Sequence, residues 1–292
     1  MGKSVAAVHL ARRFSGEIIN CDSIQVYRGF DIGTDKPFPE LRRAVPHHLL
    51  DIVDPASQFT AADFVREALK AIQSIEELGH LPLIVGGTGL YFRALLTGLF
   101  PGPGRDEALR QKLTQKIKEN GLESLRQKLE EVDPTYARLI GARDRIRIIR
   151  ALEVFYLTQK PLSEHFKATR SPLQGFHPLK IGLKLKKEEL YRKIEARVEK
   201  MFRNGIIEEV RGLLASGVDK TAPPFRALGY RHVLRYLRGE ISPEEAISLT
   251  KKDTRQYAKR QMTWFKKMEG VRWFEADDLA SVEDYVEARL AA

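Results

Sequence analysis

Two short apolar segments in the first hundred residues have the pattern of buried parallel strands. Residues 17–21 (Glu-Ile-Ile-Asn-Cys) and 81–85 (Leu-Pro-Leu-Ile-Val) each lead into polar or glycine-rich residues, which is typical of strands that end in functional loops. Between them, residues 59–78 carry apolar side chains at helical spacing: Phe64, Ala68, Ile72 and Ile75. This strand and helix alternation predicts an α/β core with a parallel sheet.

Amphipathic helices replace this alternation from about residue 105. Apolar residues three or four positions apart mark one helix on each side of Asn120-Gly121, with the stripes Leu109, Leu113, Ile117 and Leu122, Leu125, Leu129. A third helix is expected over about 144–157, and residues 180–185 have the pattern of a strand that returns to the core. We therefore expect a core made of residues 1–104 and about 134–185, with a helical addition at about 105–133.

The last third of the chain is predicted to be mainly helical. One helix is indicated by the spacing of Leu190, Ile194, Val198 and Phe202, and another by residues 206–214. A long helix then starts at residues 242–245 (Ser-Pro-Glu-Glu), which combine an N-cap serine, a proline at the first helical position and a capping-box glutamate. We expect a mainly helical part at about 186–268, and a segment at 269–292 that returns to the core.

The amino-acid composition narrows the class of protein to which this chain can belong. Of 292 residues, 43% are hydrophobic and 30% are charged, as in a globular protein. The net charge of +10 suits a polyanionic partner, but composition alone favours a basic solvated surface. The single Cys21 excludes an internal disulfide, and His47-His48 lack metal-ligand spacing. No apolar run has membrane-spanning length and no signal peptide is evident. We expect a cytoplasmic protein without a membrane partner.

Gly2-Lys3-Ser4, followed by an apolar helix-like run, has the form of the second half of a phosphate-binding loop. In such loops backbone N–H groups and a helix N-terminus hold phosphates, the lysine neutralises their charge, and the hydroxyl binds Mg²⁺. Taken alone, these three residues favour an ordinary disordered N-terminus. Their place at the start of an α/β pattern favours the phosphate-binding interpretation.

Polar residues follow both predicted strands. Asp22-Ser23 follows the first strand, where the carboxylate could accept a proton from a nucleophile or cap a turn. Gly86-Gly87-Thr88-Gly89 follows the second, where it could offer backbone donors and a hydroxyl or form a tight turn into a helix. Because parallel strands end at one edge of a sheet, convergence of these two segments with Lys3 would form a site.

Basic residues cluster on two predicted helices. One face of the last long helix carries four of them: Lys252, Arg255, Lys259 and Lys266. Another face carries Tyr257, Trp264 and Met268. A basic stripe is often a solvated face, although nearby aromatic residues are also typical of nucleic-acid contact. Arg147 and Arg150 form a smaller pair, which Glu153 could neutralise.

Five longer segments resemble, in order, motifs of the tRNA dimethylallyltransferase (IPP transferase) family. They are residues 22–34 (Asp-Ser-Ile-Gln-Val-Tyr-Arg-Gly-Phe-Asp-Ile-Gly-Thr), 86–91, 147–154, 228–231 and 254–265. The resemblance spans nearly the whole chain and implies a P-loop NTPase-like parallel sheet with helical insertions. In the family pattern a short strand and an earlier glycine precede the position of Gly2, whereas this sequence has only Met1 there. We therefore expect the natural protein to carry these residues before the first residue numbered here.

The resemblance implies transfer of a dimethylallyl group from dimethylallyl diphosphate to N6 of the adenosine 3′-adjacent to the anticodon of tRNA, giving N6-(dimethylallyl)adenosine. Asp22 resembles the general base that takes a proton from the adenine amine, and Thr88 resembles the residue that helps to hold it. Gly2, Lys3 and Ser4 match the residues of the nucleotide-binding loop that bind the diphosphate in the family. The Ser4 hydroxyl is expected to bind Mg²⁺ as well. We expect Arg211 to be a further diphosphate clamp.

The resemblance also implies tRNA contacts in four segments and at Arg110. They are Asp22, Ser23, Ile24 and Gln25; Ile146, Arg147, Ile148, Ile149 and Arg150; Arg226, Gly229, Tyr230 and Arg231; and Lys259, Arg260, Gln261, Thr263, Trp264 and Lys266. The expected partner is the anticodon stem-loop, bound by a monomer. The alternatives are a prenyltransferase for free adenine nucleotides, a P-loop kinase for small molecules, and a tRNA-binding homologue with impaired catalysis.

Overall fold

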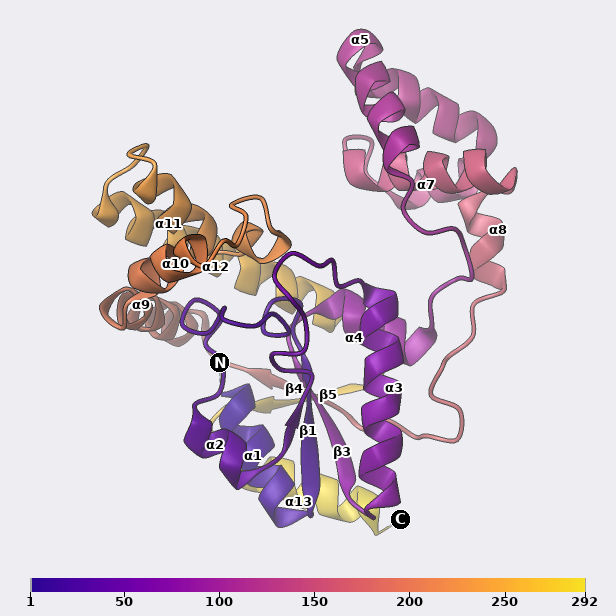
Figure 1. Cartoon of the computed structure of the whole chain (residues 1–292). Coiled ribbons are helices and arrows are strands. Elements are labelled where there is room, and N and C mark those ends of the chain that lie inside the picture. The colour runs from indigo at the N-terminus through magenta and orange to yellow at the C-terminus, as the bar shows by residue number, and fades with distance from the viewer. Residues whose placement is uncertain (1, 292) are drawn as a thin grey trace. The chain divides into compact units, whose positions relative to one another are not determined.

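The computed structural model describes residues 2–291, and the chain divides into two compact units (Figure 1). Unit 1 comprises Met1–Leu95 and Leu173–Ala292, and unit 2 comprises Leu96–Pro172. In the part described, no helix is both long enough and apolar enough to span a lipid bilayer.

Unit 1 contains a three-stranded parallel sheet with the order β2-β1-β3. β1 (Gly16–Cys21) and β3 (Leu81–Gly86) confirm the two predicted strands, whereas β2 (His47–His48) has only two residues and no pattern that predicts it. All six residues of β1 are buried, as expected for a central strand. Cys21 pairs with Gly86 at the C-terminal ends of β1 and β3, so the segments that follow these strands start side by side.

A second sheet of unit 1 pairs β4 (Lys180–Lys184) in parallel with β5 (Val271–Glu275). These strands confirm the predicted return strand and the return of the last segment, which ends in α13 (Leu279–Leu290). Within residues 2–291 the two sheets are not joined by strand pairing. They are linked through apolar side chains in one cluster, which includes Leu10, Leu83, Ile181, Leu183 and Phe274.

Four helices belong to the first part of the chain: α1 (Lys3–Arg13), α2 (Pro39–Ala44), α3 (Ala61–Glu77) and α4 (Gly89–Thr97). α3 confirms the predicted helix. It begins with a capping box between Thr60 and Asp63, and it buries one apolar face that includes Phe64, Ala68, Ala71, Ile72 and Ile75. α3 contacts β1 and β3, so this face closes one side of the sheet.

The C-terminal helices pack together in unit 1. They are α9 (Lys187–Arg203), α10 (Ile206–Ala215), a 3₁₀ turn η1 (Pro223–Arg226), α11 (Tyr230–Leu237) and α12 (Pro243–Lys266). Ser242 caps α12 by accepting the N–H of Glu245, as predicted. The core of these helices includes Val26, Tyr27 and Phe30 from the loop after β1. This shared core fixes the loop that carries Asp22 against the helices.

Unit 2 is helical and comprises α5 (Glu107–Val132), α6 (Pro134–Leu139), α7 (Arg145–Thr158) and α8 (Leu162–Lys167). The predicted break at Asn120-Gly121 is present, because Gly121 has a positive φ of 77° inside α5. α7 packs on α5 around a common core. This packing places α7 in the helical unit, so the unit is longer than the addition expected at 105–133.

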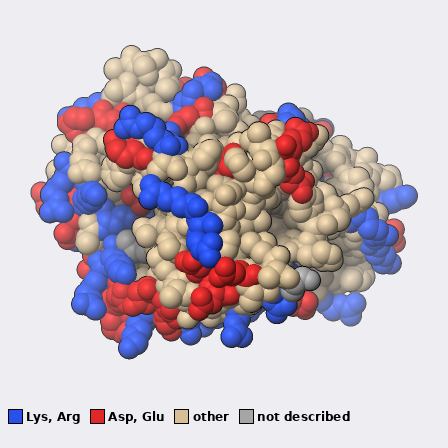
Figure 2. Space-filling view, turned by 90° about the horizontal axis from the view of Figure 1, so that it is seen from below, with Lys and Arg blue, Asp and Glu red and all other residues tan. Residues whose placement is uncertain are grey.

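The surface charges are mixed on the face shown in Figure 2. Lysine and arginine side chains lie among aspartate and glutamate side chains on this face. The net charge of +10 therefore does not form one continuous basic surface there. A binding surface for a polyanion has to be argued from local clusters of cations.

Candidate active site and RNA-binding surface

Asp22 and Thr88 lie side by side at the C-terminal ends of β1 and β3. The backbone N–H of Ser23 donates to Thr88 Oγ1 at 3.2 Å, and the backbone N–H of Thr88 donates to the carbonyl oxygen of Cys21 at 3.3 Å. The predicted convergence of these two segments is therefore present. It follows directly from the register that pairs Cys21 with Gly86.

The two oxygens of the Asp22 carboxylate have different surroundings. Oδ1 accepts the backbone N–H groups of Ile24 at 2.8 Å and Gln25 at 3.2 Å, which is the turn-forming role considered for Asp22. Oδ2 has no hydrogen-bond partner within residues 2–291. The turn fixes one oxygen and leaves the other able to accept a proton.

Lys3 opens α1, directly after Gly2 in a left-handed conformation with φ of 88°. Burial lowers the pKa of Lys3, the nearby positive charge of Arg197 lowers it further, and the negative charge of Asp22 opposes both. Lys3, Arg197 and Asp22 are therefore close enough to interact electrostatically. An anion bound beside the two cations would relieve their repulsion, as a diphosphate does.

Arg197 on α9 is a cation within electrostatic reach of Lys3 that the sequence interpretation did not consider. Its guanidinium group donates to the carbonyl oxygen of Thr34 at 3.3 Å and pairs with Asp35 at 3.3 Å. The expected clamp, Arg211, lies on α10 with its side chain 54% exposed and paired with Glu208 at 2.7 Å. In the part of the chain described, no contact links Arg211 to Lys3 or Asp22. The sequence signal for Arg197 is a cation beside the buried stripe of α9.

The glycines of the Gly86–Gly89 turn are required by close packing. A Cβ at Gly86 would lie 2.0 Å from the carbonyl oxygen of Cys21, and one at Gly89 would lie 2.4 Å from the ring of Trp264. At Gly87 a Cβ would lie 2.1 Å from Nε2 of Gln261, which donates to the carbonyl oxygen of Gly87 at 2.8 Å. α12 therefore docks directly on the turn, a role that its sequence did not indicate.

A buried lysine holds the loop that follows Asp22. Lys36 has only 1% of its side chain exposed, and its ammonium group donates to Asp31 at 2.7 Å, to Asp51 at 2.5 Å and to the carbonyl oxygen of Tyr27 at 2.6 Å. These bonds satisfy all three donors of the ammonium group. The loop is thus held together by hydrogen bonds from one buried ammonium group.

Glu209 of α10 anchors the same loop from outside. Its carboxylate accepts the backbone N–H groups of Asp31 at 3.0 Å and Ile32 at 2.7 Å, and the hydroxyl of Tyr230 at 2.5 Å. Tyr230 is fully buried, and burial together with the charge of Glu209 raises its pKa, so the hydroxyl stays protonated. We expect Tyr230 to support RNA binding by fixing this loop, because its side chain is inside the core.

The other unit 1 residues expected to contact tRNA divide into exposed and packed groups. Exposed side chains belong to Arg226, Arg231, Lys259, Arg260, Thr263 and Lys266. Gly229 is buried, and Gln261 and Trp264 pack on the glycine turn. Gln25 donates through Nε2 to the carbonyl oxygen of Thr34 at 2.9 Å. Among these residues, the exposed cations are the ones that a phosphate could reach, although Arg231 already pairs with Asp253.

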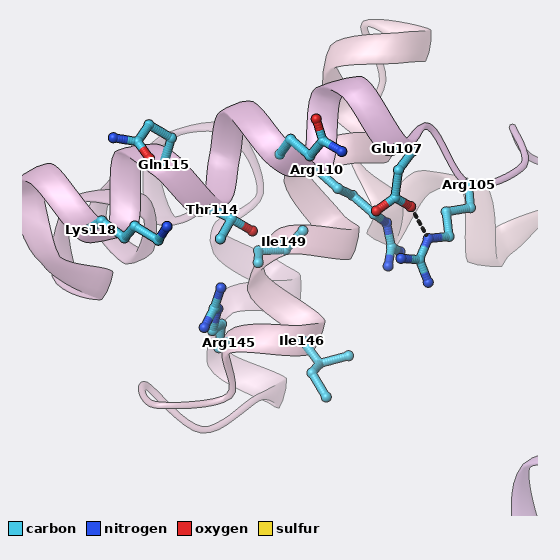
Figure 3. A pocket seen from close by; sticks show the side chains of 10 residues that line it. Arg105, Glu107, Arg110, Thr114, Gln115, Lys118, Arg145, Ile146 and Ile149 are labelled. Atoms are coloured by element: carbon cyan, nitrogen blue, oxygen red, sulfur yellow. Dashed lines mark hydrogen bonds and ion pairs between the residues drawn. The ribbon is translucent and has the colours of Figure 1, made fainter. Parts of the chain in front are cut away.

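Unit 2 has a hollow of about 730 Å³ between α5 and α7 (Figure 3). Its lining includes four cations, namely Arg105, Arg110, Lys118 and Arg145, together with Ile146 and Ile149. Glu107 is the one carboxylate in the lining and pairs with Arg105 at 2.7 Å. This excess of positive charge suits a phosphate backbone.

Glu153 fixes two of the arginines expected to contact tRNA. Its fully buried carboxylate accepts from Arg110 at 2.8 and 3.0 Å and from Arg150 at 2.6 Å. Burial raises the pKa of Glu153, but hydrogen bonds from these arginines outweigh burial and lower it overall. The pairing considered for Arg150 is therefore present. Ile148 and Ile149 are buried, whereas Ile146 is 77% exposed and Arg147 is exposed.

Comparison with known proteins identifies the family. The sequence model of the IPP transferase family matches residues 25–268, which is most of the chain. The chain belongs to the IPP transferase family. A tRNA dimethylallyltransferase of Geobacter metallireducens is 50% identical over 274 residues, covering 94% of this chain and 89% of that protein. Its counterpart in Geobacter sulfurreducens is 47% identical over 94% of this chain and 88% of the relative.

Solved structures of the IPP transferase family share the fold. The full-length tRNA isopentenylpyrophosphate transferase of Bacillus halodurans has a TM-score of 0.73 and 38% identity, covering 99% of this chain and 93% of that chain. A eukaryotic dimethylallyltransferase acting on tRNA has a TM-score of 0.79 and 29% identity, covering 100% and 75% respectively. The expected P-loop NTPase-like fold is thereby confirmed.

Proposed function

We propose that the chain transfers a dimethylallyl group from dimethylallyl diphosphate to N6 of the adenosine 3′-adjacent to the anticodon in tRNA. The observation that carries the proposal is the free Oδ2 of Asp22, next to Thr88 at the strand ends and within electrostatic reach of Lys3, which Arg197 also influences. The family relatives named tRNA dimethylallyltransferase support the same reaction. A carboxylate and a cation pair are the groups that this transfer needs.

The reaction divides between the carboxylate and the cations. The adenine N6 attacks the first carbon of the dimethylallyl group, a nitrogen–carbon bond forms, and the bond from that carbon to the diphosphate oxygen breaks. Asp22 Oδ2 takes the proton that N6 loses, and Lys3 and Arg197 neutralise the negative charge that the leaving diphosphate gains. Arg197 is held for this task by Thr34 and Asp35.

We propose that Mg²⁺ accompanies the diphosphate. Residues 2–291 contain no group of three or more His, Cys, Asp or Glu side chains arranged for a metal ion. Ser4, in the first turn of α1 next to Lys3, offers one hydroxyl oxygen, and Mg²⁺ accepts further oxygens from phosphates. Ser4 therefore suits an ion held jointly with substrate, and the ion would add positive charge where the diphosphate leaves.

The RNA would be held by its phosphates and read at the target base. The acceptor base has to leave its stack to reach Asp22, and Ser23 and Gln25 lie beside Asp22 to meet its edge. The exposed cations of α12 and the basic hollow of unit 2 suit the surrounding anticodon stem-loop. A free adenine nucleotide would use neither cation cluster, so we favour tRNA, bound by a monomer.

The test uses the purified chain, labelled dimethylallyl diphosphate and an unmodified tRNA. Asp22→Asn should abolish transfer and leave tRNA affinity nearly unchanged, because Oδ1 and its turn hydrogen bonds are retained. Asp54→Asn, at an exposed loop aspartate, is the matched control and should keep full activity. Normal turnover by Asp22→Asn would refute the role of the base. Equal rates with adenosine monophosphate and tRNA would favour the nucleotide alternative.

A further inference from the structure

A line of cations follows the solvent-exposed side of α12, and the tRNA contacts implied by the family resemblance include only part of it. Between residues 252 and 267 the sequence has six lysines and arginines and one acid, Asp253. Five of these cations are exposed and have no carboxylate within ion-pair distance in the part of the chain described. We call them the α12 cation line: Lys252, Lys259, Arg260, Lys266 and Lys267.

The helical period places this line on one face. Lys252, Lys259 and Lys266 are seven residues apart, which is close to two helical turns, and the exposed Gln256 and Thr263 lie between them. Seven residues rise by about 10.5 Å, so the distance along the helix from Lys252 to Lys266 is about 21 Å. A single phosphate or diphosphate cannot reach cations so far apart. The line therefore suits the backbone of an extended polyanion.

Two other cations of α12 turn toward α9 and are already neutralised. Lys251 pairs with Glu199, and Arg255 pairs with Glu195, both at 2.6 Å. The sequence spacing put Arg255 on the basic face with Lys252, but its ion pair takes it off that face. α12 therefore separates its charges, because the cations on the α9 side hold two helices together and the α12 cation line is left for a ligand.

Local helix stability does not account for the whole line. Lys266 and Lys267 lie at the C-terminal end of α12, where cations stabilise the negative end of the helix dipole. Lys252 lies near the middle of the helix, where this effect has faded. The neighbouring acid, Asp253, already accepts from Arg231 of α11. Lys252 gains no ion pair from its surroundings in residues 2–291, so its position favours a role in binding.

The opposite side of α12 docks on the glycine turn of the candidate active site. Gln261, about 200° around the helix from Lys259, donates to the carbonyl oxygen of Gly87 at 2.8 Å. Trp264 lies against Gly89 on the same turn. The width of a helix, about 10 Å, therefore separates the α12 cation line from this turn. A strand bound along the line would pass close to the segment that follows β3.

We propose that the α12 cation line binds the backbone of one RNA strand over about 21 Å, from Lys252 to the end of the helix. The inference rests on the proposed function, in which tRNA is the partner, and it adds Lys252 and Lys267 to the contacts that the resemblance implies. Phosphate contacts carry no sequence information. The line thus sets the path of the strand past the glycine turn, and contacts near Asp22 select the acceptor base.

The first test measures the binding of unmodified tRNA at several salt concentrations, with Lys252→Gln, Lys267→Gln and the double variant. Each single change should reduce the slope of log K against log salt concentration by about 0.7–0.9, and should weaken binding about 3- to 6-fold at 0.15 M salt. Lys251→Gln is the matched control, because Lys251 is the neighbour of Lys252 and already pairs with Glu199. An unchanged slope in Lys252→Gln, or an equal fall in Lys251→Gln, would overturn the proposal.

The second test maps the path of the strand by crosslinking. Cys21 is the single cysteine of the chain and is buried, so a cysteine introduced on the surface can be labelled selectively. Lys252→Cys and Lys267→Cys, each carrying a photoactivated crosslinker, should react with different nucleotides of one tRNA strand. Lys251→Cys should give few crosslinks. Crosslinks from Lys267→Cys alone, or crosslinks from both positions to one nucleotide, would overturn the proposal.

Binding and transfer are measured separately, so the two proposals can fail independently. In prenylation assays Lys252→Gln should raise the KM for tRNA and leave kcat unchanged, because the phosphate contact is made equally in the ground state and the transition state. A lower kcat with an unchanged KM would overturn the role of the line. A wild-type chain that binds tRNA without transferring the dimethylallyl group would refute the proposed function, while the slopes would still decide the role of Lys252. A wild-type chain that binds no tRNA would overturn both.

Discussion

Glu153 is the residue whose removal should most clearly weaken unit 2. Oε1 accepts from the backbone N–H of Asp106 at 2.9 Å and from Nε of Arg110 at 2.8 Å. Oε2 accepts from Arg110 at 3.0 Å and from Arg150 at 2.6 Å. In Glu153→Gln the amide nitrogen replaces one of these oxygens. Whichever oxygen it replaces, the amide N–H group then faces two N–H groups that had donated to that oxygen, and it can accept neither of them.

The magnitude follows from this hydrogen-bond pattern. Two hydrogen bonds to a charged group are lost, and the side chain is fully buried, so water cannot replace them. Arg110 and Arg150 keep 23% and 28% of their side chains exposed, so solvent can stabilise part of their charge. We expect a loss of about 2–4 kcal/mol in the free energy of unfolding, at the lower end of what breaking a buried pair costs.

Urea unfolding followed by two signals measures this loss. Both tryptophans, Trp264 and Trp273, lie in unit 1, so their fluorescence does not report on unit 2, whereas far-ultraviolet circular dichroism reports on the helices of both units. The circular dichroism midpoint should fall in Glu153→Gln. Glu107→Gln is the matched control, because Glu107 is 60% exposed and its single arginine pair contributes about 0–1 kcal/mol. Equal losses in both variants would refute the reasoning.

Three further predictions concern unit 1. Gly86→Ala should lower stability by about 1–3 kcal/mol in thermal melts, because its Cβ would lie 2.0 Å from the backbone oxygen of Cys21, and a normal melt would contradict this packing. Lys259→Ala combined with Arg260→Ala should weaken tRNA binding, measured by titration at several salt concentrations, and should reduce the slope of log K against log salt concentration by about 2. An unchanged slope would exclude phosphate contact by these two residues. Burial raises the pKa of Glu17, but hydrogen bonds from two histidines lower it overall, below the ordinary value of 4.5. The contribution of Glu17 to the free energy of unfolding is therefore complete above pH 4.5, and it is lost as the pH falls through the pKa of the folded protein. Glu17→Gln should therefore flatten the acid limb of a pH–stability curve, and an identical curve would refute the assignment.

Local signals in the sequence explain which parts of the fold could be predicted. Apolar runs marked β1 and β3, and Ser242 marked the start of α12, because strand burial and helix capping depend on neighbouring residues. β2 consists of His47-His48 and carries no periodicity. The extent of unit 2 depends on the packing of α7 against α5, which residue spacing within either helix does not reveal.

The site was predictable where strand ends define it. Asp22 and Thr88 follow parallel neighbours, so the order of the sheet brings them together. Arg197 lies on α9, and its place near Lys3 depends on how this helix docks on the loop after β1, through Thr34 and Asp35. A cation on a helix is common, so Arg197 and Arg211 could not be separated by sequence pattern.

The charges around Asp22 explain why this site depends on its substrate. Burial lowers the pKa of Lys3, and the positive charge of Arg197 lowers it further. Asp22 offsets part of this cost, because its negative charge favours the charged form of Lys3. A diphosphate bound between the cations would neutralise them and leave Asp22 for the amine.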